Sequence, residues 1–219
     1  MTHLDVELNR LKSEAVEMFE LVISQLRKAN ISLIDFDKDL AREVNFTEKR
    51  INSLELKIDK DCENIFALFN PVAIDLRFVL AVLKINYNLE RIGDIADGIA
   101  RYVIEAKTPF SEEVVEATRL DPMFLTAIEM LEDVQNAFLN EDAKAARSVF
   151  QKDDLLDEIN SAANKAIEGL VRADPDNISP ALHVLSSIRK LERTGDQVKN
   201  IAEEIIFYLE AKVLKHLEK

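Results

Sequence analysis

A segment of about half the chain is written twice in these 219 residues, and this repeat constrains the fold more than any other feature. Residues 89–94 read LERIGD, and 102 positions later residues 191–196 read LERTGD. Upstream, four positions of one block match a second block at an offset of 105: Val44, Glu48, Ile51 and Asn52 align with Val149, Asp153, Leu156 and Asp157. Two matched blocks in the same order indicate one structural unit duplicated in tandem.

Apolar residues recur every three or four positions along most of the chain, a spacing that predicts long amphipathic helices. Only four Gly and five Pro interrupt it, and no segment has the alternation of a strand. The sequence therefore predicts an all-α fold of two tandem, pseudo-symmetric three-helix bundles with spectrin-like up-down packing. The six long helices are expected at residues 5–29, 35–69, 75–107, 121–139, 142–172 and 179–217.

Prolines indicate where helices end and where the repeats divide. Asn70-Pro71 and Thr108-Pro109 are expected to close two helices, because the residue before proline is disfavoured in the α conformation. We therefore place the repeats at residues 1–108 and 109–219, with a linker at about 109–120.

The second repeat has a candidate helix start directly after this linker. Asp121 followed by Pro122 is typical of an N-cap and a first helical position, so we expect the fourth helix to begin there.

The charge balance excludes several classes of partner. The chain has 41 acidic against 28 basic residues and a net charge of −13, which argues against binding of nucleic acid or of an anionic lipid surface. The single cysteine, Cys62, has no partner for an intrachain disulfide. No run of 18 apolar residues occurs, and the first residues lack a basic segment followed by an apolar one. We expect a cytosolic protein that is neither secreted nor inserted in a membrane.

Each repeat is expected to place two polar pairs on facing helices. Glu90 and Asp94 are four residues apart and so share one helix face, and Glu48 and Asn52 do the same on the preceding helix. If this hairpin turns near residue 72, the two pairs lie at the same height to within one helical turn. The same construction predicts a second cluster in the second repeat, formed by Asp153, Asp157, Glu192 and Asp196.

Carboxylates held this close repel one another unless a cation lies among them, and oxygen ligands suit hard cations such as Mg²⁺ or Mn²⁺. The eight residues are therefore candidate metal ligands. Four carboxylates in the second cluster, against three and Asn52 in the first, predict tighter binding at the second. The alternative is a solvated face on which nearby cations, among them Lys199, pair with the acids.

Gly93 and Gly195 lie inside the expected helices at equivalent positions of the two repeats. A mid-helix glycine costs about 1 kcal/mol relative to alanine, so a duplicated one indicates a structural need. Close approach of a neighbouring helix and room for the acidic cluster are the two explanations.

Residues 67–77 (ALFNPVAIDLR) and 83–94 (LKINYNLERIGD), with a second motif copy at 191–203, resemble the PhoU family. The resemblance extends over residues 8–210 and implies two three-helix bundles. It also implies iron or zinc clusters, held in some members by the acidic motifs that here contain Glu48, Glu90 and Asp94, and by the four carboxylates of the second repeat. Asn52 departs from the acidic pattern, and Gly98 stands where the family often has Asn, as at position 200.

The resemblance further implies a negative regulator of phosphate uptake and of the phosphate-starvation response. Such a protein acts at the cytosolic face of a phosphate ABC transporter and a sensor histidine kinase, and we expect a homodimer that reaches the inner membrane through these partners. We expect no enzyme, because no catalytic triad order, glycine-rich phosphate loop or CxxC is present.

Three other functions stay open from the sequence. One is a helical adaptor whose carboxylates bind no metal. Another is an accessory protein of a sodium-coupled phosphate carrier. A carboxylate-metal hydrolase or oxidase is disfavoured, because no base or nucleophile is evident and the Glu-x-x-His signature of di-iron bundles is absent.

Overall fold

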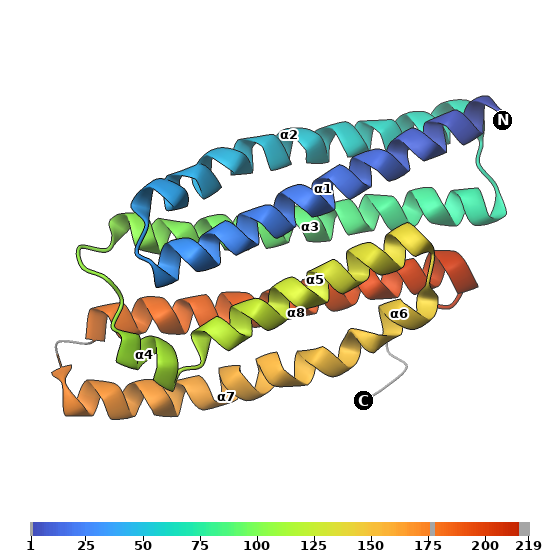
Figure 1. Cartoon of the computed structure of the whole chain (residues 1–219). Helices are drawn as coiled ribbons and strands as arrows, with labels where there is room; N and C mark the ends of the chain where they lie inside the picture. Colours follow the sequence, from blue (N-terminus) through green and yellow to red (C-terminus); the bar gives the residue numbers. More distant parts are fainter. Residues whose placement is uncertain (1, 176–177, 215–219) are drawn as a thin grey trace.

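The computed structural model describes residues 2–175 and 178–214, and within these residues the chain is helical with no strand (Figure 1). The two predicted three-helix bundles are present. The first consists of α1 (His3–Ile34), α2 (Lys38–Phe69) and α3 (Ala73–Glu105). In the second, α5 (Leu120–Asn140) and α8 (Ile178–Glu210) are two of the three helical segments. The third is divided into α6 (Ala143–Ser148) and α7 (Phe150–Ala173), and the short helix α4 (Glu112–Ala117) precedes all three. The division into autonomous units at residue 108 stays a prediction.

The first bundle illustrates how the sequence produces these helices. Thr2 caps α1 by accepting a hydrogen bond from the Asp5 backbone N–H at 3.1 Å, while the Asp5 carboxylate accepts one from the Thr2 N–H at 2.6 Å. From there Leu11, Met18 and Leu26 fall on one face and are fully buried against α2 and α3.

The two bundles pack through α3 and α8, which run antiparallel along the middle of the molecule, and through α1 against α5 (Figure 1). The α3–α8 interface is partly polar: the Lys84 ammonium lies 2.9 Å from a carboxylate oxygen of Glu204, and the Arg77 Nε–H donates to the Tyr208 carbonyl at 3.2 Å. Phe78 packs against Tyr208 with ring centroids 5.6 Å apart, so apolar and polar contacts alternate along the seam.

One prediction about the start of the second bundle was wrong, because Asp121 is not the N-cap of α5. The segment expected as a linker at 109–120 contains the short helix α4, and its role as a linker stays a prediction. The N-cap position of α5 belongs to Arg119, which adopts a left-handed conformation with φ of 55°. Asp121 lies within the first turn, where its carboxylate accepts a hydrogen bond from the Asn30 side chain of α1 at 3.1 Å. Its polar group thus serves interbundle packing rather than capping.

The last two predicted helices also differ from the observed ones, the first by a break and the second by an earlier end. The helix expected at 142–172 is divided at Val149, where the Lys152 N–H donates to the Val149 carbonyl at 3.0 Å, an i+3 bond that tightens the turn. The helix expected to reach residue 217 stops at Glu210, because Ala211 adopts a φ of 57°. Residues 215–217 of that prediction lie outside the described residues.

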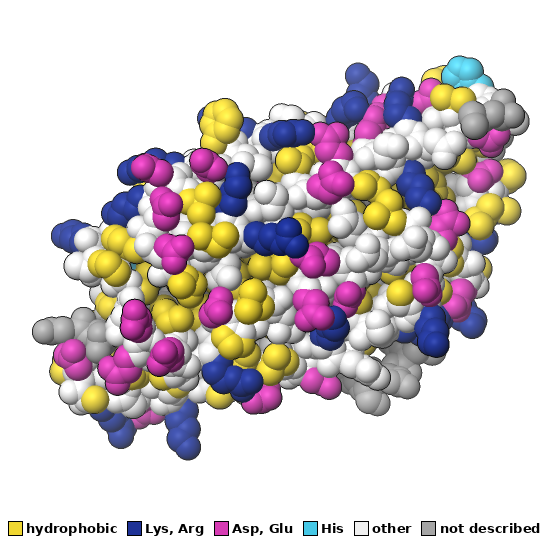
Figure 2. All heavy atoms as spheres, viewed as in Figure 1, with side chains coloured by type: hydrophobic (Ala, Val, Ile, Leu, Met, Phe, Trp, Pro, Cys, Tyr) yellow, Lys and Arg dark blue, Asp and Glu magenta, His cyan; other side chains and the backbone are white. Residues whose placement is uncertain are grey.

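Surface charge is mixed on the face shown in Figure 2, where basic and acidic side chains are interspersed rather than gathered into blocks of one sign. Among the described helices, none is both long and apolar enough to cross a membrane.

Candidate metal centre

Glu48 of α2 meets Glu90 and Asp94 of α3 where the two helices face each other. One carboxylate oxygen from each residue lies within 4.8 Å of the others, a spacing that a single metal ion spans. The helical period and the turn at Asn70-Pro71 thus bring together three of the four residues predicted for this cluster. Asn52 lies one turn further along α2 and is exposed to solvent.

Glu48 is the buried member of this cluster, with 7% of its surface exposed. One of its oxygens accepts a hydrogen bond from the Gln25 Nε2 of α1 at 2.9 Å, and the other has no hydrogen-bond partner among the described residues. Burial raises the pKa of Glu48 to about 7, and the Asp94 and Asp97 carboxylates act in the same direction. Such a group requires either a proton or a nearby cation.

Neighbouring residues extend this negative region along α2 and α3. Burial raises the pKa of Glu90, and Asp94 and Glu55 add to the effect. Asp97 lies one turn further along α3, but it is neutralised by the Arg101 guanidinium at 2.5 Å and accepts a hydrogen bond from Asn45 at 2.8 Å. The open acidic group therefore consists of Glu48, Glu90 and Asp94.

Gln25 is a functional neighbour that the sequence interpretation missed. It is 1% exposed and also donates to the Val44 carbonyl at 3.2 Å, so it fixes the Glu48 carboxylate against the backbone of α2. The available signal was its position beside Leu26 on the apolar stripe of α1, where a polar residue needs a buried partner.

The second cluster is arranged differently, because the Lys199 ammonium of α8 lies inside it. Lys199 forms an ion pair with Asp153 of α7 and lies 2.9 Å from a carboxylate oxygen of Asp196. Asp153 is 5% exposed, and its burial raises its pKa although Lys199 acts in the opposite direction. Glu192 is half-buried and Asp157 is exposed.

The structure therefore favours the opposite ranking of the two clusters from the one that the carboxylate count predicts. In the second cluster an ammonium already supplies the positive charge that a metal would supply. Within residues 2–175 and 178–214, the first cluster is the one group of three acidic, His or Cys side chains with ligand atoms close enough to share an ion.

The duplicated glycines lie directly under the two clusters, where a neighbouring helix also approaches closely. A Cβ added at Gly195 would come within 2.5 Å of an Asp153 carboxylate oxygen and 2.6 Å of the Leu156 Cδ1. At Gly93 it would lie 3.1 Å from the Gln25 Oε1 and 3.4 Å from a Glu48 oxygen. The absence of a side chain at each glycine thus lets the neighbouring helix come close and leaves room for its buried acid, Glu48 at Gly93 and Asp153 at Gly195.

We expect Gly195→Ala to lower the free energy of unfolding by about 1–3 kcal/mol through overpacking. Gly169 of α7 is a matched control, because a Cβ there meets no atom within 4 Å. Gly169→Ala should instead raise stability by about 0.5–1 kcal/mol through helix propensity. Urea denaturation of both variants tests this, and equal signs would contradict the packing described at Gly195.

Comparison with known proteins places the whole chain in one family. A family model described as the PhoU domain matches residues 15–103 and 120–205. The phosphate-specific transport system accessory protein PhoU homolog of Pseudomonas putida is 34% identical over 217 residues, covering 97% of this chain and 83% of that protein. The phosphate-specific transport system accessory protein PhoU of Escherichia coli is 30% identical over 213 residues, covering 97% and 88%.

Two crystal structures show the same fold. PhoU from Pseudomonas aeruginosa matches with a TM-score of 0.90 at 32% identity, covering 96% of this chain and 100% of that one. The phosphate transport system regulatory protein PhoU from Streptococcus pneumoniae matches with a TM-score of 0.87 at 30% identity, covering 97% and 99%. On both the family model and the full-length similarity, this chain belongs to the PhoU family.

Proposed function

We propose that this protein negatively regulates phosphate uptake and the phosphate-starvation response in the cytosol. It acts by contact with a phosphate ABC transporter and a sensor histidine kinase. The observation that supports this most is the similarity over 97% of the chain to proteins named as phosphate-specific transport system accessory proteins. Homodimer formation stays a prediction, which sedimentation analysis tests.

We propose a regulator without an enzymatic step, because the relatives are named as accessory or regulatory proteins. The two described histidines pack against aromatic rings: His3 stacks on Phe69 with ring centroids 5.3 Å apart, and His183 packs against Tyr102 at 5.0 Å.

We also propose that Glu48, Glu90 and Asp94 hold a metal ion. The fit rests on the unpartnered buried oxygen of Glu48 and on three carboxylate oxygens within 4.8 Å of one another. An all-carboxylate set favours iron, manganese or magnesium over zinc, which prefers nitrogen and sulfur ligands. A bound cation neutralises the cluster and links α2 to α3. The second cluster does not fit a metal while Lys199 is bonded to Asp153 and Asp196.

Deletion and complementation test both parts of this proposal. Deleting the gene should derepress a phosphate-starvation reporter at high phosphate, and the wild-type protein should restore repression. The variant Glu48→Gln/Glu90→Gln/Asp94→Asn should lose bound metal, measured by mass spectrometry, and should repress less. Glu63→Gln is the matched control, because Glu63 is an exposed glutamate on the same helix as Glu48.

The possible outcomes separate the two parts. An unchanged reporter in the deletion strain would falsify the regulatory proposal. Full repression by a triple variant that binds no metal would instead support the helical adaptor that acts without metal.

A further inference from the structure

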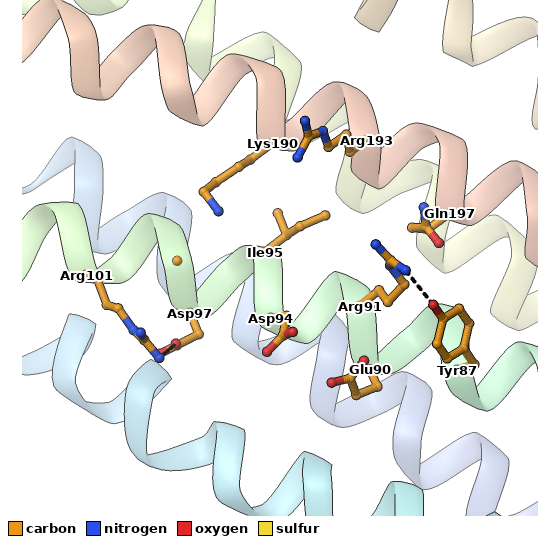
Figure 3. Close-up of a pocket in the computed structure, with 11 residues that line it drawn as sticks. Tyr87, Glu90, Arg91, Asp94, Ile95, Asp97, Arg101, Lys190, Arg193 and Gln197 are labelled. Atoms are coloured by element: carbon orange, nitrogen blue, oxygen red, sulfur yellow. Dashed lines mark hydrogen bonds and ion pairs between the residues drawn. The ribbon is translucent and has the colours of Figure 1, made fainter.

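A pocket of about 570 Å³ lies between α3 and α8, on the seam that joins the two bundles (Figure 3). Cations from both helices line it: Arg91 and Arg101 from α3, and Lys190 and Arg193 from α8. Its volume is in the range of pockets that bind small molecules. In a chain with a net charge of −13, four basic side chains around one pocket need an explanation.

Three of these cations have no ion-pair partner among the residues that the structure describes. Arg101 is paired with Asp97 at 2.5 Å. Arg91 donates to the Tyr87 hydroxyl at 2.5 Å and lies over its ring, and its charge also acts on Glu90 without an ion pair between them. The side-chain nitrogens of Lys190 and Arg193 line the pocket and have neither an ion-pair partner nor a hydrogen-bond acceptor among the described residues. Positive charges gathered in this way repel one another and attract an anion.

Gly98 determines where the Lys190 ammonium lies. A Cβ at position 98 would come within 2.6 Å of the Lys190 Nζ and 3.2 Å of its Cε, so the side chain crosses α3 at the point where α3 has no side chain. The equivalent position of the second repeat is Asn200, so this gap is present in one copy only. The sequence thus makes room for the ammonium in the pocket.

The carboxylates that line the same pocket lie on its other side. In Figure 3, Glu90 and Asp94 point away from α8, whereas Lys190 extends from α8 toward α3, and Arg193 lines the pocket from α8. Arg91 and Arg193 are equivalent residues of the repeated LER-x-GD motif. In each repeat, therefore, the acidic pair of the motif faces the preceding helix of the same bundle, and the arginine faces the interface between α3 and α8.

We propose that this pocket binds an anion that carries phosphate groups, with Arg91 and Arg193 as hydrogen-bond donors and Lys190 as a compact charge. The planar guanidinium matches two phosphate oxygens at once, and a lysine adds charge without a fixed geometry. Three basic side chains without an ion-pair partner among the described residues suit a dianion or a short phosphate chain. The source is free orthophosphate, pyrophosphate or a nucleoside triphosphate. This inference goes beyond the proposed regulation and does not depend on bound metal.

Calorimetric titration of chelator-treated protein at low ionic strength tests the proposal, with orthophosphate, pyrophosphate, ATP and sulfate as probes. Lys190→Met and Arg193→Met should each weaken binding of the preferred phosphate compound about tenfold or more. Gly98→Ala should also weaken it, because the new Cβ displaces the ammonium without removing its charge. Arg189→Met is the matched control, since Arg189 is exposed on α8 and its guanidinium lies 3.4 Å from Asn164 of α7.

The outcomes are distinct. Tighter binding of pyrophosphate or ATP than of orthophosphate supports the site with a phosphate chain as its ligand, and the reverse order supports it with free phosphate. Binding of no probe at 10 mM, on the order of the weakest useful affinity, overturns the proposal. Equal binding of sulfate and phosphate, or unchanged affinity in both the Lys190 and the Arg193 variants, also overturns it.

Discussion

Replacing Lys199 with methionine should lower the free energy of unfolding by about 3 kcal/mol at pH 8, the cost of leaving a buried charge without its partner. The Lys199 ammonium lies 2.9 Å from Asp196 and forms an ion pair with Asp153, which is 5% exposed. Although burial opposes it, bonding to these two carboxylates raises the pKa of Lys199 above its usual value. Methionine keeps the length of the side chain and removes only the charge.

The loss should depend on pH in a definite direction. Burial raises the pKa of Asp153 in the folded protein, so this group favours folding when it is protonated and opposes folding when it is charged. Without Lys199 its pKa rises further. The destabilisation of Lys199→Met is therefore expected to be largest at pH 8 and to shrink toward pH 5. Urea denaturation at the two pH values measures this.

Two further variants identify the cause. Asp153→Asn combined with Lys199→Met should recover most of the lost stability, because no buried charge then remains. Lys165→Met, at an exposed site on α7, should change stability by less than about 0.5 kcal/mol. If Lys199→Met unfolds at the same urea concentration as the wild type, Lys199 does not stabilise the fold by neutralising Asp153 and Asp196. Rescue of Lys199→Met by Mn²⁺ would show that the lysine occupies a latent metal site.

The contrast between the two clusters shows what the sequence can predict about such a site. The heights of the acidic pairs follow from the helical period and from the position of one turn, so the meeting of Glu48 with Glu90 and Asp94 was predictable. The direction of a long lysine side chain is not fixed by the period. Pairing of Lys199 with the acids of the second cluster was one of the two alternatives that the sequence left open. The ammonium could reach either solvent or Asp153, and the folded structure places it on Asp153.

The same limit explains the errors in the helix boundaries. The signal at Asn70-Pro71 correctly indicated the end of α2 at Phe69, where Asn70 adopts the left-handed conformation that asparagine tolerates at a helix C-terminus, with φ of 51°. Arg119 precedes α5 and Ala211 follows α8, and both residues have a positive φ. Neither is a glycine, so the residue type gave no signal of a helix boundary at these positions. Backbone hydrogen bonds hold both residues: the Arg119 N–H donates to the Glu116 carbonyl at 3.0 Å, and the Ala211 N–H donates to the Phe207 carbonyl at 2.9 Å.

Replacing Glu48 with glutamine should stabilise the metal-free protein at pH 8. In the folded state the pKa of Glu48 is raised to about 7 from an unfolded value of 4.5. The folded state therefore binds more protons between these values, and the contribution of Glu48 to stability is full below about pH 4.5 and lost as the pH rises through 7. The loss amounts to roughly 3 kcal/mol at most. Glutamine carries no charge and keeps an oxygen that accepts the Gln25 hydrogen bond.

A bound cation should reverse this order of stability. Metal binding adds to the stability of the wild type in proportion to the logarithm of metal concentration over the dissociation constant, and Glu48→Gln loses one of three carboxylate ligands. Thermal melts at pH 8 with chelator should therefore place Glu48→Gln above the wild type, and melts with Mn²⁺ should place it below. Glu63→Gln should follow the wild type in both. If Glu48→Gln is less stable than the wild type with and without metal, then Glu48 serves packing alone. In that case the three carboxylates do not form a metal site, because a buried ligand carboxylate opposes folding until its cation is bound.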